Sequence, residues 1–271
     1  MTKVGIIGYG SIGQELARQI TEKGWSISWI ISRETIKDME GNVIGESSNW
    51  QAQKKVDLVF LCIPSNQAEM ARDYIQFFAE KNIPIVTCEK GALSMYPTVL
   101  EYYAPKIGKS ATGGGGTRML SWLSLRSSPD ICEISGVLNG TLNYIFDELT
   151  NGKSQNDVLA DVLERKYAEP GSTTLSEVIA AELGDLTKKA IILTNESGIL
   201  EEKLTWKPDE YTVEGFFLEK ALQNPSEYRF LYILADHEYS GFIGGMEIES
   251  GKWWCYAGLF LVKNASFELP K

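Results

Sequence analysis

Short apolar runs alternate with amphipathic stretches through the first half of the chain. Four runs have the length of strands, at residues 4–7, 26–31, 56–63 and 83–87. Residues 14–21 and 67–80 instead repeat their apolar positions with helical spacing. Because continuous apolar runs are typical of parallel strands covered on both faces, this half predicts a doubly wound, Rossmann-type α/β sheet.

The second half has a different pattern. Two helices are predicted between residues 142 and 166, with a break near Asn151-Gly152, and a longer helix at 175–194. Four strands are then predicted, at 211–217, 228–236, 240–250 and 252–263, with hairpin turns at 236–241 and 250–251. We therefore expect two domains, an α/β domain over residues 1–134 and a smaller α+β domain with a mostly antiparallel sheet over residues 135–271.

The composition narrows the class of protein. Of the 271 residues, 44% are apolar and 23% charged, which is ordinary for a globular protein. The 26 basic and 36 acidic residues give a net charge of −10 without a basic patch, so we do not expect nucleic acid as a partner. The chain opens on a strand rather than a signal peptide, and no apolar run has membrane-spanning length. We therefore expect a cytoplasmic protein that does not bind membranes.

The four cysteines are widely spaced and form no Cys-x-x-Cys pair. Cys62, Cys132 and Cys255 lie in apolar runs, which is typical of reduced, buried thiols. Cys88 follows a predicted strand, where a thiol can be reactive or inert.

A glycine-rich turn joins the first predicted strand to the first predicted helix. The segment is Gly8-Tyr9-Gly10-Ser11-Ile12-Gly13. In such a Gly-x-Gly-x-x-Gly turn, glycines permit a tight bend, close approach of a pyrophosphate and packing of helix on strand. Its place between strand and helix predicts that residues 1–134 bind a dinucleotide, with Gly8, Gly10, Ser11, Ile12 and Gly13 in contact with it.

The second predicted strand ends in Ser32-Arg33-Glu34. A small residue followed by a cation suits the 2′-phosphate of NADP, so we expect NADP, with NAD possible. The alternative is that Arg33 is only solvated and Glu34 binds the ribose of NAD.

Three further residues follow strands at the same edge of the predicted sheet: Pro64, Ser65 and Lys90. This edge is where cofactor and substrate meet in doubly wound proteins. Lys90 is therefore either a cation at the mouth of a cofactor cleft or a solvated lysine.

A predicted strand at 131–138 stops at Asn139-Gly140, and a helix begins at once with Thr141 as the expected N-cap. Backbone N–H groups at such a helix start can bind a carboxylate. The alternative is a buried turn that needs Asn-Gly only for its backbone angles.

Asp185 and Lys189 are four residues apart on the predicted helix at 175–194 and share a face. Such a pair is often only a surface ion pair. However, Lys189 leads into an apolar run, and a partly buried lysine that Asp185 holds in place could donate a proton. His237, the only histidine, lies in a predicted turn and is not expected to be catalytic.

Several ordered motifs resemble the homoserine dehydrogenase family. Residues 136–145 are similar to its Gly-Ile-Leu-Asn-Gly-Thr-x-Asn-Tyr-Ile signature, and residues 86–94 to its Val-Thr-Ala-Asn-Lys-x-x-x-Ser segment. Residues 111–120 resemble its glycine-rich Ala-Thr-Val-Gly-Gly-Gly-Thr loop, Tyr167-Ala168-Glu169 its Tyr-Ala/Thr-Glu motif, and 184–189 its helix with Asp and, four residues later, Lys. Together with the glycine turn, these motifs cover most of the chain.

The resemblance implies NAD(P)-dependent interconversion of L-homoserine and L-aspartate 4-semialdehyde, in threonine and methionine biosynthesis. The substrate ammonium would bind Glu169, and its carboxylate the backbone near Asn139, Gly140 and Thr141. Lys189, assisted by Lys90, would stabilise the reacting oxygen, and Asp185 would orient the amine or the substrate. A homodimer and a substrate-binding role for residues 135–271 are also implied.

The chain departs from the family pattern at several positions. Glu89 stands where the family often has Asn, Arg118 where it has Pro, and Ser110 where some members have a carboxylate of a monovalent-cation site, so a metal site is left open. Glu177 and Glu182 are both candidates for a second acidic substrate ligand. The chain ends at Lys271 without the family's Gly-Ala-Gly and Thr-Ala segment, and we expect a short form without a regulatory domain or an incomplete one.

Two other functions remain alternatives. One is a related amino-acid reductase, such as an aspartate dehydrogenase or a dihydrodipicolinate reductase. The other is a non-catalytic NADP-binding homologue or fragment.

Overall fold

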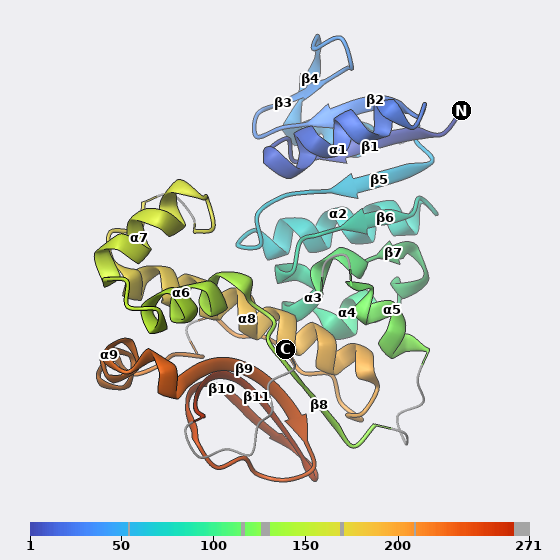
Figure 1. The fold of residues 1–271 in the computed structure, drawn as a ribbon. Coiled ribbons are helices and arrows are strands. Elements are labelled where there is room, and N and C mark those ends of the chain that lie inside the picture. Colours follow the sequence, from blue (N-terminus) through green and yellow to red (C-terminus); the bar gives the residue numbers. More distant parts are fainter. Residues whose placement is uncertain (54, 115–116, 126–130, 169–170, 209, 263–271) are drawn as a thin grey trace. The chain divides into compact units, whose positions relative to one another are not determined.

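The computed structural model describes residues 1–271 except 54, 115–116, 126–130, 169–170, 209 and 263–271. The chain divides into two compact units, Met1–Ser121 and Trp122–Lys271, and each is described by itself (Figure 1). No helix within the described residues has the length and apolarity that crossing a bilayer requires.

Unit 1 (Met1–Ser121) is built on a seven-stranded sheet with strand order β4-β3-β2-β1-β5-β6-β7. Its strands are β1 (Lys3–Ile7), β2 (Ser26–Ile31), β3 (Thr35–Lys37), β4 (Val43–Glu46), β5 (Leu58–Leu61), β6 (Ile85–Thr87) and β7 (Ile107–Gly108). The pairs β2–β1, β1–β5, β5–β6 and β6–β7 are parallel, which confirms the predicted Rossmann-type core. The strands β3 and β4, which the sequence pattern did not reveal, extend the β2 edge in antiparallel fashion.

Helices cover this sheet and link its strands. They are α1 (Ser11–Glu22), α2 (Ala68–Glu80), α3 (Gly91–Met95) and α4 (Pro97–Glu101), with 3-10 turns η1 (Ser47–Ala52), η2 (Ala104–Lys106) and η3 (Ser110–Thr112). Helix α5 (Met119–Ser124) spans the division between the units. Ala17 and Ile20 of α1 pack on Val4, Ile6 and Ile27, so the apolar faces predicted from spacing meet in the core.

Unit 2 (Trp122–Lys271) contains a four-stranded antiparallel sheet with order β10-β11-β9-β8. Its strands are β8 (Glu133–Gly136), β9 (Tyr228–Ala235), β10 (Phe242–Ser250) and β11 (Trp253–Leu261). Its helices are α6 (Gly140–Thr150), α7 (Gln155–Glu164), α8 (Leu175–Ser197) and α9 (Gly215–Gln223), with the 3-10 turn η6 (Pro225–Glu227). Helix α8 packs on the sheet, where the Thr194 hydroxyl lies 2.8 Å from the Tyr232 hydroxyl.

Two predictions for unit 2 are wrong. Residues 211–217 are not a strand: apart from an isolated bridge between Thr212 and Gly245, the segment leads into α9. The buried positions Leu218, Ala221 and Leu222 have helical spacing. Burial of this helical face therefore decides the local structure, rather than the alternation of apolar and polar residues that predicted a strand. The segment 236–241 is not a hairpin either, because β9 and β10 both pair with β11 and are not neighbours. The predicted hairpin at 250–251 is confirmed.

Candidate functional site

The glycine turn of unit 1 combines two tightly packed glycines with an open one. Gly8 has a φ of 90°, and a Cβ atom on it would lie 2.5 Å from the Cys62 carbonyl oxygen. A Cβ atom on Gly13 would lie 2.1 Å from the Gly8 carbonyl oxygen. Gly10, in contrast, has nothing within 4 Å of its Cβ position. The structure therefore needs Gly8 and Gly13 for its own packing, and Gly10 leaves space beside the backbone at the start of α1.

This turn lies where β1 has β2 on one side and β5 on the other. In a doubly wound sheet this is the topological switch point, beyond whose strand ends ligands bind. Ser11 and Ile12 form the first residues of α1, and Ile12 is 59% exposed. All the predicted residues of the turn are therefore at the expected edge of the sheet.

The turn after β2 holds the residues predicted to select the cofactor. The Ser32 hydroxyl donates to the Thr35 carbonyl at 3.0 Å and lies 3.0 Å from the Thr35 hydroxyl. Arg33 and Glu34 are both exposed. Ser32 therefore shapes the turn, and the guanidinium and the carboxylate both remain at the surface, so both cofactor alternatives are physically open.

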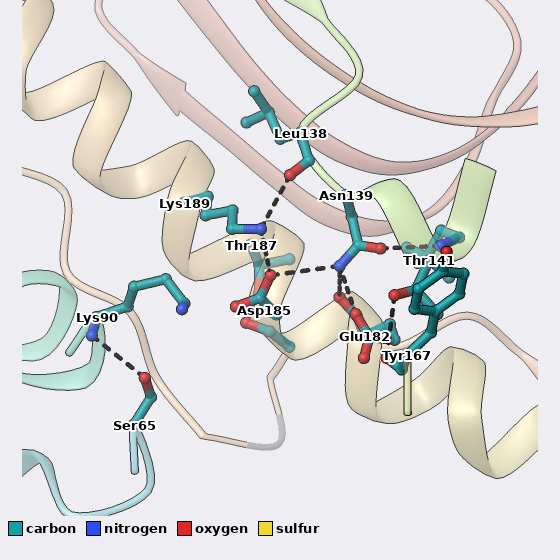
Figure 2. Close-up of polar contacts among 12 residues, drawn as sticks. Ser65, Lys90, Leu138, Asn139, Thr141, Tyr167, Glu182, Asp185, Thr187 and Lys189 are labelled. Carbon is teal, nitrogen blue, oxygen red and sulfur yellow. Dashed lines mark hydrogen bonds and ion pairs between the residues drawn. The ribbon is translucent and has the colours of Figure 1, made fainter. Parts of the chain in front are cut away.

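Ser65 and Lys90 come together at the ends of β5 and β6. The Lys90 backbone N–H donates to the Ser65 hydroxyl at 3.2 Å (Figure 2). Next to them the carboxylate of Glu89, only 1% exposed, accepts hydrogen bonds from the N–H groups of Gly91 and Ala92. The glutamate that departs from the family pattern therefore accepts from the first two N–H groups of α3, which have no carbonyl partner within the helix.

The turn between β8 and α6 corrects one prediction. The N-cap of α6 is Asn139 rather than Thr141, because the Asn139 side-chain oxygen accepts from the Leu142 N–H at 2.8 Å. Thr141 lies inside the first turn, and its hydroxyl donates to the Tyr167 carbonyl at 3.1 Å. The N–H groups of Gly140 and Thr141 belong to the helix start, whose first amides have no carbonyl partner within the helix.

Asn139 also joins this turn to α8. Its amide nitrogen donates to Glu182 Oε2 at 2.6 Å and to Asp185 Oδ2 at 3.3 Å (Figure 2). Because Asn139 is 4% exposed, its two amide atoms are held in fixed positions. One side chain therefore caps α6 and fixes two carboxylates of α8.

Lys189 completes the cluster. Its ammonium lies 2.6 Å from Asp185 Oδ2 and donates to the Leu138 carbonyl at 3.0 Å. The Lys189 and Asp185 side chains are 22% and 27% exposed, so the pair is partly buried. An ammonium has three N–H groups, and within the described residues these contacts engage two of them. The third is available for an oxygen atom of a ligand.

The structure distinguishes the two further acidic candidates. Glu177 accepts from the Thr173 N–H at 2.7 Å and the Thr174 N–H at 3.3 Å, and forms a capping box with Thr174 at the start of α8. These hydrogen bonds lower the pKa of Glu177, and the bond from the Thr173 N–H has the largest effect. Glu177 is therefore committed to the helix end, whereas Glu182 lies in the cluster with Asn139. Sequence spacing could not separate them, since the partner of Glu182 is 43 residues away.

Other candidates have different positions. Glu169, the predicted ammonium ligand, lies outside the described residues. His237 is exposed, stacks on Tyr239 and lies 3.4 Å from Asp236. No group of three or more His, Cys, Asp or Glu side chains suited to a metal ion occurs among the described residues.

All four cysteines are free thiols, but only Cys255 is buried. Cys62 is half-buried and Cys132 is exposed, so the expectation of a buried thiol is wrong for these two. Both lie next to strands β5 and β8 rather than within them, which leaves their side chains near the surface.

The two units therefore define an α/β protein in which a Rossmann-type unit with a glycine turn precedes an α+β unit with a polar cluster of Asn139, Glu182, Asp185 and Lys189. Residues 121–216, which carry this cluster, match the family model of homoserine dehydrogenase. Residues 3–83 match the model described as NADP oxidoreductase, coenzyme F420-dependent. The resemblance found in the sequence motifs is thus confirmed.

Individual proteins show the same resemblance. A maize protein named bifunctional aspartokinase/homoserine dehydrogenase 2, chloroplastic, is 34% identical over 92 residues, which are 33% of this chain and 9% of that protein. The homoserine dehydrogenase of Lactococcus lactis is 24% identical over 282 residues, covering 96% of this chain and 63% of that enzyme. The chain thus spans less than two thirds of these relatives.

A solved structure shows the same fold. It is a hyperthermophilic archaeal homoserine dehydrogenase in complex with NADPH, with a TM-score of 0.69 at 16% identity, covering 98% of this chain and 83% of that one. At this level of identity the likeness supports the fold.

Proposed function

We propose that this protein is an NADP-dependent homoserine dehydrogenase, which interconverts L-homoserine and L-aspartate 4-semialdehyde. The observation that carries the proposal is the cluster of Asn139, Glu182, Asp185 and Lys189. It lies inside the segment that matches the homoserine dehydrogenase model. The cluster also combines carboxylates, which can bind the ammonium of an amino acid, with an ammonium, which can stabilise a reacting oxygen.

The first requirement is binding of the substrate's two charged groups. Glu182 and Asp185 bring two carboxylates to Asn139, and Asp185 also binds the ammonium of Lys189. A carboxylate is the group that binds an ammonium, so Glu182 is the proposed ligand of the substrate ammonium, together with Glu169. The substrate carboxylate would bind the N–H groups of Gly140 and Thr141 at the positive end of α6. Asn139 positions both subsites because it belongs to both.

The second requirement is control of a proton at the reacting oxygen. During reduction of the aldehyde this oxygen gains negative charge, and a nearby acid or cation stabilises it. Lys189 would donate its proton to that oxygen, and in the oxidation it would take the proton of the hydroxyl group. The contacts to Asp185 and Leu138 hold the ammonium in place. Lys90 is proposed as the assisting cation of unit 1.

The cofactor fits the glycine turn of unit 1. The open space at Gly10 and the strand ends at the switch point provide a cradle for a pyrophosphate, lined by Gly8, Gly10, Ser11, Ile12 and Gly13. Ser32 and Arg33 would hold the 2′-phosphate, and Pro64, Ser65 and Lys90 would border the nicotinamide side. NADP supplies the hydride acceptor of the reaction. The archaeal structure with the same fold is an NADPH complex, which supports this choice.

The wider role follows from the activity. The substrate is a small amino acid, and the reaction would belong to threonine and methionine biosynthesis. We also propose a homodimer, as the resemblance implies.

An absorbance assay tests the proposal. The purified protein is incubated with NADP and L-homoserine, and formation of NADPH is followed. Turnover of homoserine is the expected result. Turnover of L-aspartate but not homoserine would instead assign an aspartate dehydrogenase. Binding of NADPH without turnover of either substrate would assign a non-catalytic homologue.

A further inference from the structure

Two thiols lie side by side at the ligand edge of the unit 1 sheet. Cys62 follows strand β5 and Cys88 follows strand β6. These two strands pair in parallel, and Leu61 at the end of β5 lies opposite Thr87 at the end of β6. The residue that directly follows each strand is therefore a cysteine. The Cys62 N–H donates to the Ile7 carbonyl at 2.7 Å and the Cys88 N–H to the Leu61 carbonyl at 3.4 Å, so the backbone holds both residues in sheet-like positions.

This spacing permits a bond between the two sulfur atoms. Neighbouring strands lie about 4.8 Å apart. Disulfides join Cα atoms about 4.4–6.8 Å apart, and this strand spacing falls within that range. The Cys88 thiol donates to the Leu61 carbonyl at 3.9 Å, and a hydrogen bond between the Cys62 and Cys88 side chains shifts the pKa of both, so the two side chains lie close together.

The two sulfur atoms differ in chemistry. The hydrogen bond from Cys62, followed by the positive charge of Lys90, lowers the pKa of Cys88 to about 7, against the opposing effect of burial. The same hydrogen bond raises the pKa of Cys62, and burial adds to this effect. Cys88 is thus the sulfur that is readily a thiolate, and Cys62 is the one that retains its proton. Both are half-buried, so a small oxidant has access.

We propose that Cys62 and Cys88 form a redox-sensitive dithiol that hydrogen peroxide converts to a disulfide. The Cys88 thiolate attacks one peroxide oxygen, the O–O bond breaks, and a sulfenic acid and hydroxide form. The Cys62 sulfur then attacks the Cys88 sulfur, the S–S bond forms, and the S–O bond breaks. The hydroxide leaves with the Cys62 proton as water. The two cysteines lose two electrons, and the peroxide gains them.

The disulfide would act on the glycine turn. The Cys62 carbonyl oxygen packs tightly against Gly8, since a Cβ atom on Gly8 would lie only 2.5 Å from it. A shift of the Cys62 backbone would therefore be passed on to Gly8. Bringing the sulfur atoms to about 2.05 Å pulls on the Cys62 backbone and shifts that contact. This consequence rests on the proposed cofactor: oxidation would weaken NADPH binding about tenfold, which corresponds to about 1.4 kcal/mol, and dithiothreitol would restore it.

Peptide mapping tests the bond itself. The protein is treated with hydrogen peroxide, its remaining thiols are alkylated, and it is digested with trypsin without reduction. We expect peptides 56–72 and 82–90 joined through Cys62 and Cys88, and separated again by dithiothreitol. In Cys62→Ser the oxidation should stop at a Cys88 sulfenic acid, which dimedone traps. Peptides that stay separate in the wild type, with Cys88 reduced or oxidised alone, would overturn the proposal.

Fluorescence titration with NADPH tests the consequence. The oxidised wild type should bind about tenfold more weakly than the reduced form, and Cys88→Ser should not respond to peroxide. A disulfide with unchanged affinity would overturn the coupling to the glycine turn. If the reduced protein does not bind NADPH at all, the proposed function fails, and peptide mapping still decides whether the dithiol exists.

Discussion

The amide nitrogen of Asn139 lies 2.6 Å from the carboxylate of Glu182, although 43 residues separate them in the chain. The same side chain caps α6 through its oxygen atom. Asn139 thus links the strand-to-helix turn to helix α8 inside unit 2. This link arranges the proposed ammonium and carboxylate subsites with one residue.

Two substitutions separate the roles of Asn139. Asn139→Ala removes the cap and the amide, and the free energy of unfolding should fall by about 1 kcal/mol from the lost cap alone. Asn139→Ser keeps an acceptor for the Leu142 N–H but cannot donate to both carboxylates. We expect Asn139→Ser to unfold near the wild-type temperature and still to raise KM for homoserine about tenfold, by loss of a hydrogen bond to a charged group. Wild-type KM in Asn139→Ser would show that the link has no part in binding.

The glycine turn yields a matched pair of variants. Gly13→Ala places a Cβ atom 2.1 Å from the Gly8 carbonyl and should lower the melting temperature of the protein. Gly10→Ala meets nothing within 4 Å and should melt like the wild type. If Gly10 leaves space for a pyrophosphate, Gly10→Ala should nevertheless weaken NADPH binding about tenfold or more. Unchanged affinity in Gly10→Ala would mean that the cofactor does not approach the turn.

Cofactor choice can be assigned to Arg33 or Glu34. A charge-assisted hydrogen bond to the 2′-phosphate contributes about 1.5–3 kcal/mol, so Arg33→Ala should raise KM for NADP at least about tenfold and leave KM for NAD unchanged. Glu34→Gln is the control and should change neither value. If Glu34→Gln instead raises KM for NAD in a protein that prefers NAD, the acidic alternative is correct.

The reactivity of Cys88 should depend on pH near neutrality. Its pKa, lowered mainly by the Cys62 hydrogen bond and also by Lys90 against burial and Glu89, is about 7. Because the thiolate is the nucleophile, the rate of alkylation by iodoacetamide should rise with pH to half its maximum at about pH 7. Burial raises the pKa of Cys255 to about 12, so Cys255 should stay unmodified in the folded protein. A half-maximal rate above about pH 8.5, the value of an ordinary thiol, would contradict the assigned environment.

Periodicity predicted much of unit 1, because buried parallel strands leave continuous apolar runs. The run at 26–31 coincides with β2, and the helix at 67–80 begins one residue before α2. The short strands β3 and β4 were not predicted, because their burial is uneven and leaves no continuous apolar run; Val43, for example, is 61% exposed. In unit 2 the strand order was wrong, since neither alternation nor turn residues specify which strands pair.

The candidate site was predicted in part. The Asp185–Lys189 pair follows from helical spacing, and the structure shows the contact. The N-cap at Asn139 is a local feature, since its partner is the N–H three residues later and Asn is preferred over Thr at this position. The bond of Asn139 to Glu182, in contrast, depends on a tertiary contact that no local pattern encodes. The pairing of Cys62 with Cys88 likewise requires the sheet register, although both residues follow strands in the sequence.

The most direct measurement is the turnover of L-homoserine by Lys189→Ala, with Lys189→Met as the variant that keeps the packing of the side chain. A positioned proton donor contributes about 100-fold or more to the rate, so kcat should fall by at least that factor in both variants. Their affinity for NADPH should stay at the wild-type value, since Lys189 belongs to unit 2. Wild-type kcat in a folded Lys189→Met protein would contradict the account.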